Sequence, residues 1–489
     1  MEQNQVPAGE PAPAPKISLC MIVRNEEHNI ADCLACVKDL VDEMIVVDTG
    51  STDRTKEIAA GLGARVYDFT WVDSFAAARN ESLRHAKGKW IFWLDADDRI
   101  DEENRAKLKR LFERVGDELD AYLLHCLIVP SDPGEQPRVV DHGRLFRNHP
   151  ELRWHYRVHE QILPAVHRLG GKTIKTDVVV QHIGYQDASK RPGKLERNRQ
   201  LLELEHKDNP NDAFTLYNLG RINERLGKVP EAMPYWRRCL SLVPPNETYV
   251  AKLYSLLAHG HRQLGQRYKM MTTVLAGLVR FPDHADLLFL AGCLLHESGD
   301  YLAAEKYFQQ LQAAPKDKYF SLGDNVGITT FQAKHHLARL YRDMRRNAEA
   351  ERLWREALAD DPNFAQAWLG LGQVLMDMKR WDELDQVIQQ LEGQQHCKVE
   401  AITLRGLKLA TQAQWDPARK LMEEACTQYP EAIEPRLLLS RILVRYPQDK
   451  RATLKVLQEL LKLDPSNGEA RRALEKFKRE NAAAPAPAR

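Results

Sequence analysis

The pattern of hydrophobic and polar residues divides the chain into two parts near residue 200. In the first part, short apolar runs typical of buried strands alternate with amphipathic stretches typical of helices. Strands that alternate with helices predict an α/β fold, in which helices cover both faces of a mostly parallel sheet. Strands are expected at residues 17–23, 43–47, 65–67, 89–94, 121–129 and 178–183, and helices at residues 27–40, 52–62, 74–86 and 101–115.

From about residue 201 onward the periodicity is helical alone. Asn347, Trp381 and Trp415 lie 34 residues apart at expected turns, and proline recurs near the end of most units. A 34-residue helix–turn–helix period is the signature of tetratricopeptide repeats. We therefore predict about seven repeats, a loop inserted at residues 319–330, and a capping helix at residues 468–478. Small residues after the turns allow close helix packing, namely Ala304, Ala350 and Ala418.

These patterns predict four regions along the chain. The first is a disordered, Pro/Ala-rich arm at residues 1–15, and the second is the α/β domain at residues 16–200. The third is an all-α tetratricopeptide solenoid at residues 201–480, and a disordered tail follows at residues 481–489. Pro/Ala-rich ends without apolar periodicity cannot bury enough surface to order themselves.

The charge balance gives no case for binding to nucleic acid or to a membrane surface, because 70 Lys and Arg face 69 Asp and Glu. No apolar run approaches the roughly 18 residues of a membrane span. The N-terminus lacks the basic and apolar regions of a signal peptide, so we expect a cytoplasmic protein. Cys33 and Cys36 form a Cys-x-x-Cys pair with redox or zinc potential. No second pair lies nearby, which favours small buried helix residues.

The run Trp93 to Asp98 leaves a buried strand and becomes acidic. Two carboxylates spaced i, i+2 beyond a strand end can hold a divalent cation, and that cation can hold a diphosphate. Three further polar segments fall at the same expected sheet edge, at residues 24–27, 48–53 and 79–80. Each has a plainer interpretation alone, as a capped or solvated turn or a surface ion pair. Together, they predict a binding site.

In this order, the four segments resemble the motifs of family 2 glycosyltransferases of the GT-A fold, over about residues 16–190. The resemblance implies that Asp48 binds the base of a uridine-type nucleotide and that Asp97 binds Mn²⁺ or Mg²⁺. Asp95 would face the ribose or the donor sugar, and Arg79 would lie near the nucleotide or the metal motif. Many members carry an aromatic residue where Arg24 stands, and a guanidinium can also stack on a base. The remaining nucleotide-sugar-binding residues implied are Arg24, Asn25, Glu26 and Asp53.

Residues 154–160 and 181–185 resemble a branch of that family that includes bacterial peptide S-glycosyltransferases and tetratricopeptide-linked enzymes. By analogy, Glu160 is the base that takes the acceptor's proton, and His159 is the alternative. His182 is either a further metal ligand or a core histidine that only forms hydrogen bonds. A basic segment follows with Lys190, Arg191, Lys194 and Arg197. It could fold over a diphosphate, but a linker into the repeats is favoured.

The resemblance implies an inverting, metal-dependent glycosyltransferase with a nucleotide-sugar donor, most simply a UDP-sugar. The concave groove of a repeat array holds extended peptides, so we expect a polypeptide acceptor or partner protein there. A homodimer is the alternative use of the array. Two rival functions remain: an interaction scaffold with an inactive transferase domain, and a nucleotidyltransferase on a similar sheet. No Gly-x-Gly-x-x-Gly follows the first strand, which disfavours a dinucleotide oxidoreductase.

Overall fold

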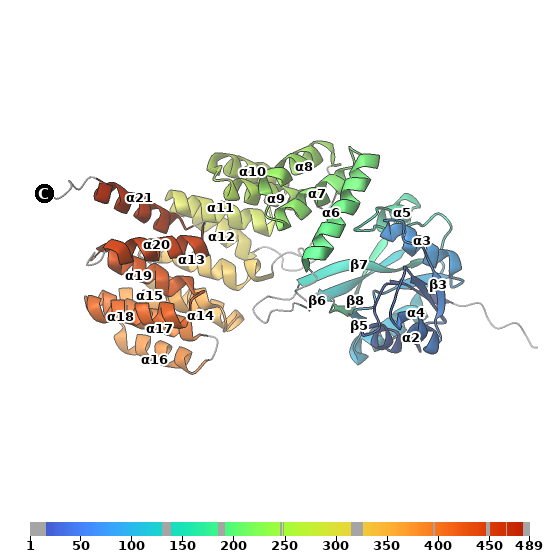
Figure 1. Cartoon of the computed structure of the whole chain (residues 1–489), viewed down its shortest axis with the longest axis horizontal. Helices are drawn as coiled ribbons and strands as arrows, with labels where there is room; N and C mark the ends of the chain where they lie inside the picture. Colours follow the sequence, from blue (N-terminus) through green and yellow to red (C-terminus); the bar gives the residue numbers. More distant parts are fainter. Residues whose placement is uncertain are drawn as a thin grey trace, which may run out of the picture. The chain divides into compact units, whose positions relative to one another are not determined.

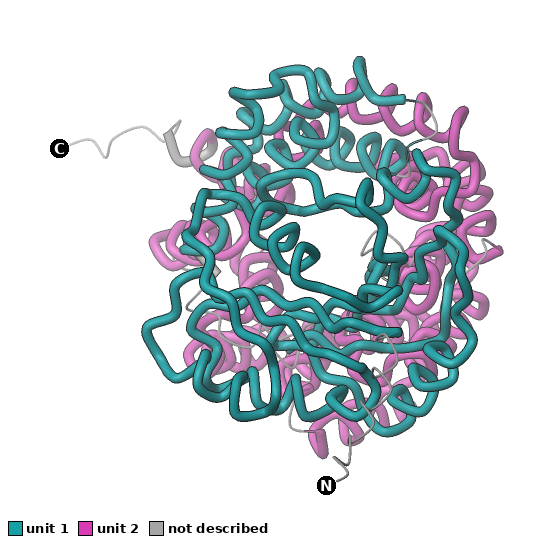
Figure 2. The backbone as a smooth tube through the Cα atoms, turned by 90° about the vertical axis from the view of Figure 1, so that its right-hand side faces the viewer, with its two compact units in different colours: residues 1–260, 316–326 teal, residues 261–315, 327–489 magenta. Residues whose placement is uncertain are grey.

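The computed structural model describes residues 16–129, 138–183, 191–244, 247, 249–313, 326–394, 397–445, 450–465 and 467–482. The arm at residues 1–15, residues 483–489 of the tail and most of the inserted loop predicted at residues 319–330 lie outside the described residues. The chain divides into two compact units, residues 1–260 with 316–326 and residues 261–315 with 327–489 (Figure 2).

The described part of the first unit contains an eight-stranded sheet in the order β3-β2-β1-β4-β7-β6-β8-β5 (Figure 1). Strands β1 to β4 are parallel, β7 runs antiparallel to β4 and β6, and β8 runs parallel to β6. The predicted α/β class is confirmed, with a mixed sheet. The strands are β1 (Ile17–Val23), β2 (Glu43–Asp48), β3 (Arg65–Asp68), β4 (Trp90–Trp93), β5 (Asp98–Arg99), β6 (Ala121–Ile128), β7 (Arg138–Arg147) and β8 (Thr173–His182).

Both faces of the sheet are buried, as continuous apolar strands require. Along β1, Leu19 and Met21 join the core on one face, while Cys20 joins the core on the other. Neighbouring residues of a strand point to opposite faces, so an apolar run such as β1 supplies both cores. The covering helices are α1 (Ile30–Ala35), α2 (Thr55–Gly61), α3 (Phe75–His85), α4 (Glu102–Arg114) and α5 (Leu163–Arg168).

The strand order positions the ligand site. Chain connections run from β1 outward to β2 and β3, then return to β4 on the other side of β1. A crevice opens beyond the carboxyl ends of two parallel strands where the order reverses in this way. The residues that follow β1 and β4 are Arg24 to Glu26 and Leu94 to Asp98, the segments with the predicted binding residues.

Beyond the sheet, every described element is helical, which confirms the predicted all-α region. The helices of the first unit are α6 (Arg191–Asp208), α7 (Ala213–Arg225), α8 (Val229–Leu242) and the greater part of α9 (Val250–Gln263). Those of the second unit are α10 (Arg267–Arg280), α11 (Ala285–Ser298), α12 (Tyr301–Ala313), α13 (Phe331–Asp343), α14 (Asn347–Asp360), α15 (Ala365–Asp377), α16 (Trp381–Glu392), α17 (Lys398–Thr411), α18 (Trp415–Gln428), α19 (Ile433–Arg445), α20 (Lys450–Leu463) and α21 (Gly468–Ala482), with a 3₁₀ turn at Val326–Thr329.

The 34-residue spacing has a direct structural meaning. Asn347, Trp381 and Trp415 are each the first residue of the second helix in a pair, in α14, α16 and α18. Within some helix pairs, a glycine of one helix faces a large side chain of the other, because the two helices pack closely there. A β-carbon on Gly220 would collide with Trp236, and one on Gly292 would collide with Phe308. The predicted small residues Ala304, Ala350 and Ala418 are fully buried.

Helix α6 packs against the sheet domain of its own unit. Leu201 and Leu202 are buried in one cluster with Val158, Leu219 and Ile222. The cluster therefore joins α6 and α7 to the loop that precedes α5. The predicted domain boundary at residue 200 falls inside α6.

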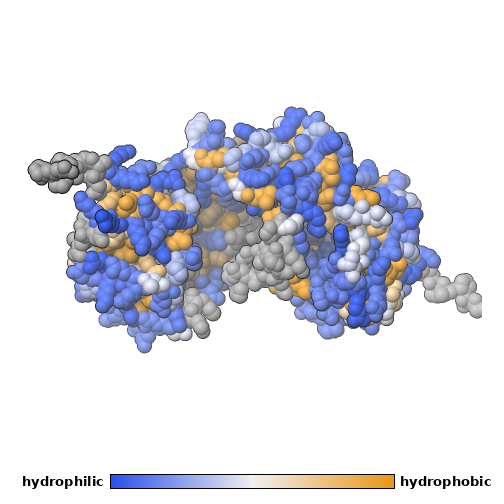
Figure 3. Space-filling view, viewed as in Figure 1, coloured by the Kyte–Doolittle hydropathy of each residue, from blue (hydrophilic) through white to orange (hydrophobic). Residues whose placement is uncertain are grey.

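Across the described residues, no helix combines the length and apolar character that crossing a bilayer demands. The face drawn in Figure 3 is mostly hydrophilic, with scattered apolar patches over the described residues.

Candidate active site

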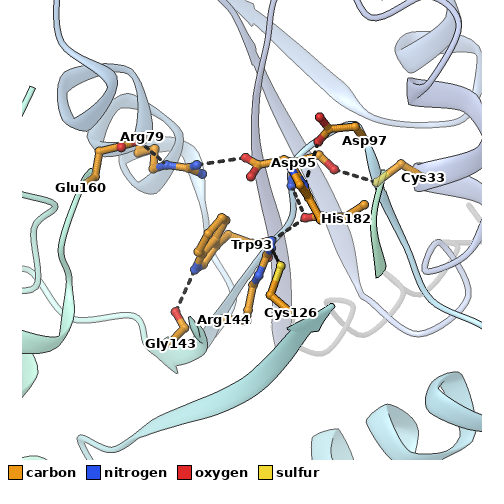
Figure 4. A network of polar contacts seen from close by, with 11 residues as sticks. Cys33, Arg79, Trp93, Asp95, Asp97, Cys126, Gly143, Arg144, Glu160 and His182 are labelled. Atoms are coloured by element: carbon orange, nitrogen blue, oxygen red, sulfur yellow. Dashed lines mark hydrogen bonds and ion pairs between the residues drawn. The ribbon is translucent and has the colours of Figure 1, made fainter. Parts of the chain in front are cut away.

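An acidic cluster forms where β4 ends and β5 begins. Asp95, Asp97, Asp98 and His182 offer ligand atoms that all lie within 4.8 Å of one another (Figure 4). His182 reaches the cluster because β8 pairs with β5, which sets His182 opposite Asp98. Oδ1 of Asp97 and Nδ1 of His182, the two predicted metal ligands, are 3.4 Å apart, and their role as ligands stays a prediction.

Asp98 acts as the support of this cluster. Its side chain is fully buried and pairs with the buried guanidinium of Arg144 at 2.5 Å. Its carboxylate also accepts the backbone N–H of Asp95 and lies 3.0 Å from Nδ1 of His182. Although burial opposes ionisation, the Arg144 charge and the His182 hydrogen bond hold the pKa of Asp98 well below its usual range. Asp98 is thus ionised and fixes the orientation of the His182 ring.

Asp97 is the crowded carboxylate of the cluster. Its side chain is only 17% exposed, and burial together with the charges of Asp95, Asp98 and Glu26 raises the pKa of Asp97 to about 6, against the opposing effect of His182. The charge of His182 compensates the carboxylates around Asp97 only in part. A hard divalent cation would supply more positive charge, and carboxylate oxygens are its preferred ligands. The residues present therefore fit Mn²⁺ or Mg²⁺, with Asp97 and His182 as candidate ligands beside the buried Asp98.

Arg79 joins the acidic cluster to the predicted base. Its Nη2 donates to Asp95 and its Nε to Glu160, both at 2.9 Å (Figure 4). The guanidinium lies 4.3 Å from the ring centre of Trp93 and 5.3 Å from that of Trp154. Burial favours the neutral form, but the charges of Asp95 and Glu160 outweigh it and raise the pKa of Arg79. One buried cation therefore fixes both carboxylates on the same side of the sheet.

The loop that carries His159 and Glu160 is held in a specific conformation. Asn80 holds this loop through two hydrogen bonds of 2.9 Å. Its side-chain oxygen accepts the N–H of Trp154, and its side-chain nitrogen donates to the carbonyl of Trp154. Tyr156 and His159 have positive φ angles of 72° and 60°, a conformation that costs energy for residues other than glycine. Such strain is characteristic of functional loops.

His159, the alternative base, is largely neutral at pH 7. Solvent reaches the ring, but many protein atoms surround it. The resulting loss of hydration is the largest cause of the lowered pKa of His159, which is about 4. The charges of Arg221 and Arg225 on α7 add to the effect. A neutral imidazole can accept a proton, but one that stays neutral down to pH 4 is a weak base. The geometry favours Glu160, and both roles stay predictions.

Two loops at the carboxyl ends of β1 and β2 form the predicted nucleotide pocket. The buried Asp48 uses Oδ1 to accept the N–H groups of Gly50 and Ser51, while its buried Oδ2 has no hydrogen-bond partner among the described residues. An unpartnered buried carboxylate oxygen is costly, and a donor group of a ligand would satisfy it. This observation agrees with the predicted contact between Asp48 and a nucleotide base.

Asn25 and Asp53 hold these two loops together. Asn25 has a φ of 55°, and its side-chain oxygen accepts the N–H of Thr52 at 2.8 Å. Asp53 accepts hydrogen bonds from Thr55 and from the N–H of Glu27. Both side chains are thus engaged in loop contacts, and direct binding of the nucleotide by them stays a prediction. The charge of Glu26 contributes to the raised pKa of Asp97, so Glu26 lies near the acidic cluster.

Several residues of the site were not singled out for it by sequence reasoning. Asp98 was quoted in the acidic run but given no role, and Arg144 lies 46 residues away in β7. The thiol of Cys33 donates to the carbonyl of Asp95 at 3.2 Å, so this cysteine supports the acidic loop. Three aspartates within four residues after a buried strand were the available signal for Asp98. No local signal marks Cys33, whose partner is distant in sequence.

The sheet has a topological switch point, an acidic cluster beyond β4 and a carboxylate with an unpartnered oxygen beyond β2, as a ligand site at this edge of an α/β domain requires. In the comparison with known proteins, residues 18–168 match the family described as Glycosyl transferase family 2. Residues 273–318 and 336–383 match the tetratricopeptide repeat family. The chain therefore carries a family 2 glycosyltransferase domain followed by tetratricopeptide repeats.

Two curated relatives are each similar to about half of this chain. A TPR repeat-containing protein of Synechococcus elongatus is 36% identical over 251 residues, which cover 50% of this chain and 60% of the relative. The SPbeta prophage-derived glycosyltransferase SunS of Bacillus subtilis is 30% identical over 243 residues, covering 49% and 56%. The match thus spans less than two thirds of either relative. A solved tetratricopeptide repeat protein from Parabacteroides merdae aligns with a TM-score of 0.40 and 19% identity, over 52% of this chain and 94% of its own.

Proposed function

We propose that this protein is an inverting, metal-dependent glycosyltransferase that moves a sugar from a nucleotide-sugar, a UDP-sugar in the simplest case, to a polypeptide acceptor recruited by the repeats. The observation that carries the proposal is the arrangement around Arg79. This one buried guanidinium connects the acidic cluster, through Asp95, with the candidate base Glu160. A donor site and a proton acceptor are thereby fixed relative to each other.

The chemical step follows from that arrangement. The bond between the anomeric carbon and the phosphate oxygen breaks, and its electron pair leaves with the nucleoside diphosphate. The acceptor atom bonds to the anomeric carbon from the opposite face, while Glu160 takes the proton that the acceptor loses. A divalent cation, when bound, neutralises charge on the diphosphate.

The chain's own residues position these groups. Asp95 and Asp48 orient the donor, Asp97 and His182 hold the cation, and Arg79 aims the Glu160 carboxylate at the acceptor. Trp93 and Trp154 cover Arg79 on its apolar side and keep water from this ion pair. An ion pair shielded from water fixes its partners more firmly than an exposed one does.

The proposal is tested by calorimetry of UDP binding with and without Mn²⁺. Wild-type protein should bind UDP more tightly with Mn²⁺, and Asp97→Asn should weaken metal-dependent binding by about tenfold or more, since one lost ligand is worth at least about 1.4 kcal/mol. Asp177→Asn is the matched control, because Asp177 lies on the same strand as His182 but its side chain is 81% exposed.

The outcomes separate the rival functions. Absence of UDP binding under both conditions contradicts a UDP-sugar donor and leaves another nucleotide donor or the scaffold function. Incubation with a UDP-sugar and, separately, with UTP and a sugar 1-phosphate then identifies the reaction by its product. Release of UDP from the UDP-sugar supports glycosyl transfer, whereas release of pyrophosphate from UTP supports nucleotidyl transfer.

A further inference from the structure

Helix α6 places an arginine beside the candidate active site. Arg197 lies with its guanidinium carbon 5.0 Å from the ring centre of Phe75, at the start of α3. Residues four apart on a helix share one face, so Phe75 and Arg79 lie on the same side of α3. Arg197 is therefore about one helical turn from the guanidinium that joins Asp95 to Glu160.

Packing and charge both place Arg197 there. Leu195, two residues before it, packs in the cluster that contains Val158 and Phe75, so the first turns of α6 are held against the loop of the candidate base. Burial lowers the pKa of Arg197, the charge of Arg24 lowers it further, and the charge of Glu160 opposes both effects. Arg197, Arg24 and Glu160 are thus within electrostatic reach of one another.

Arg24 and Arg197 are both exposed to solvent, so both can reach a ligand. Within the part of the chain that the structure describes, no ion pair involves Arg24 or Arg197, and Glu160 is already paired with Arg79. Arg197 has one side-chain hydrogen bond, a donation of 3.4 Å to its neighbour Asn198. The two guanidiniums repel each other, and an anion that both contact would remove this repulsion.

We propose that Arg197, together with Arg24, binds the diphosphate of the nucleotide donor, so that the first helix beyond the sheet completes the donor site. The proposal rests on the proposed function and adds a residue of the helical region to it. A guanidinium fits phosphate oxygens with paired, charge-assisted hydrogen bonds. Arg197 acts here as a binding and positioning residue, because it would hold the leaving diphosphate.

The test compares UDP with uridine, which has the same base and sugar but no phosphate. UDP binding is measured by calorimetry with Mn²⁺, and the weaker uridine binding by saturation-transfer NMR, for wild type and Arg197→Gln. We expect the dissociation constant for UDP to rise about tenfold in the variant, because a charged contact to phosphate is lost. Uridine binding should not change.

Arg199→Gln is the matched control on the same helix. Arg199 pairs with Glu196 and Glu203 of α6 itself, so its loss should leave UDP binding unchanged. Equal urea midpoints for both variants show that the fold is intact.

Three outcomes overturn the proposal. Unchanged UDP binding in Arg197→Gln refutes a diphosphate contact while leaving the proposed function in place. An equal loss of UDP and uridine binding shows that Arg197 only supports the pocket. A wild-type protein that binds no UDP at all contradicts both this proposal and the UDP-dependent function.

Discussion

A buried pair of opposite charges explains how three acidic side chains within four residues, Asp95, Asp97 and Asp98, take different roles. Arg144 neutralises Asp98 where both are almost completely buried. The guanidinium also lies 4.0 Å from the ring centre of Trp93, the last residue of β4. Asp98 is therefore held inward, and the loop turns Asp97 toward His182. A buried charge tolerates such a place only with its partner. Sequence alone shows three aspartates but not which one is neutralised.

The crowding of Asp97 predicts a pH dependence of the metal-free protein. The pKa of Asp97 is about 6 in the folded state, above its ordinary 3.8, so the folded protein binds this proton more tightly than the unfolded chain does. Its contribution to stability is present below pH 3.8 and is lost as the pH rises through 6. The pKa of His182 is also raised, and its contribution changes in the same direction.

Asp97→Asn should thus gain stability relative to wild type as the pH rises from about 3.8 to 6, by up to about 3 kcal/mol at 1.36 kcal/mol per pH unit, and keep that gain at pH 7.5. Urea unfolding in the presence of a chelator measures this difference, and Asp177→Asn should show none of it. Added Mn²⁺ should reverse the order at pH 7.5, because the wild type alone keeps the full ligand set. If the free energies of unfolding of wild type and Asp97→Asn differed by the same amount at all pH values, the pKa of Asp97 would not be raised by its surroundings.

At this scale the sequence predicted the site only partly. Asp97 and His182 were expected to be metal ligands, and the pairing of β5 with β8 does bring them together. Asp48 was expected at the base, and its unpartnered oxygen agrees. Asp53 was expected to bind the donor, yet its oxygens accept bonds from the neighbouring loop. A motif fixes residue types and order, but the hydrogen bonds that each side chain makes depend on residues tens of positions away.

At the scale of elements, apolar strands were the predictable part of the fold. Strand β1 was predicted with its observed bounds, because seven continuous buried residues leave little ambiguity. Strand β7 was not predicted. Its sequence contains Asp141, His142, Gly143 and Arg144, which interrupt any apolar pattern. Arg144 is nevertheless buried, since its partner Asp98 comes from a different element. Polar residues paired across a sheet are invisible to an analysis of local pattern.

Helix α6 belongs to the helical part of the sequence but packs on the sheet domain. This packing leads to a prediction at the scale of elements. Leu202 is 2% exposed and belongs to the cluster around Val158, whereas Leu204 on the same helix is 38% exposed. Leu202→Ala should lower the free energy of unfolding by about 2–5 kcal/mol, the usual cost of a cavity in a core. Leu204→Ala should cost less than about 1 kcal/mol.

Urea unfolding, followed by circular dichroism, measures both variants. Equal losses would show that α6 is not anchored through Leu202. If α6 is loosened in the Leu202 variant, UDP binding should weaken as well, because Arg197 is carried by the same helix.

At the scale of the whole molecule, the division into two compact units differs from the division suggested by composition. Composition changes near residue 200, where strands give way to helices. The first compact unit continues to residue 260 and includes α6 to α8. The reason is physical: α6 and α7 bury Leu201, Leu202, Leu219 and Ile222 with Val158 of the sheet domain. Composition reports the type of element, whereas a domain is defined by what packs together.

This division predicts that nucleotide binding resides in the first unit alone. Every residue assigned here to the donor site lies between Arg24 and Arg197, and the residues that support them belong to the same unit. A chain that ends at Gly265, in the turn after α9, should therefore fold cooperatively and bind UDP with Mn²⁺ as tightly as the full-length protein. A chain that ends at residue 200 should not, because it lacks the second half of α6 and the cluster around Val158. Calorimetry and urea unfolding of both fragments test this. Weak UDP binding by a folded fragment ending at Gly265 would instead show that the second unit, or residues 316–326, contributes to the donor site.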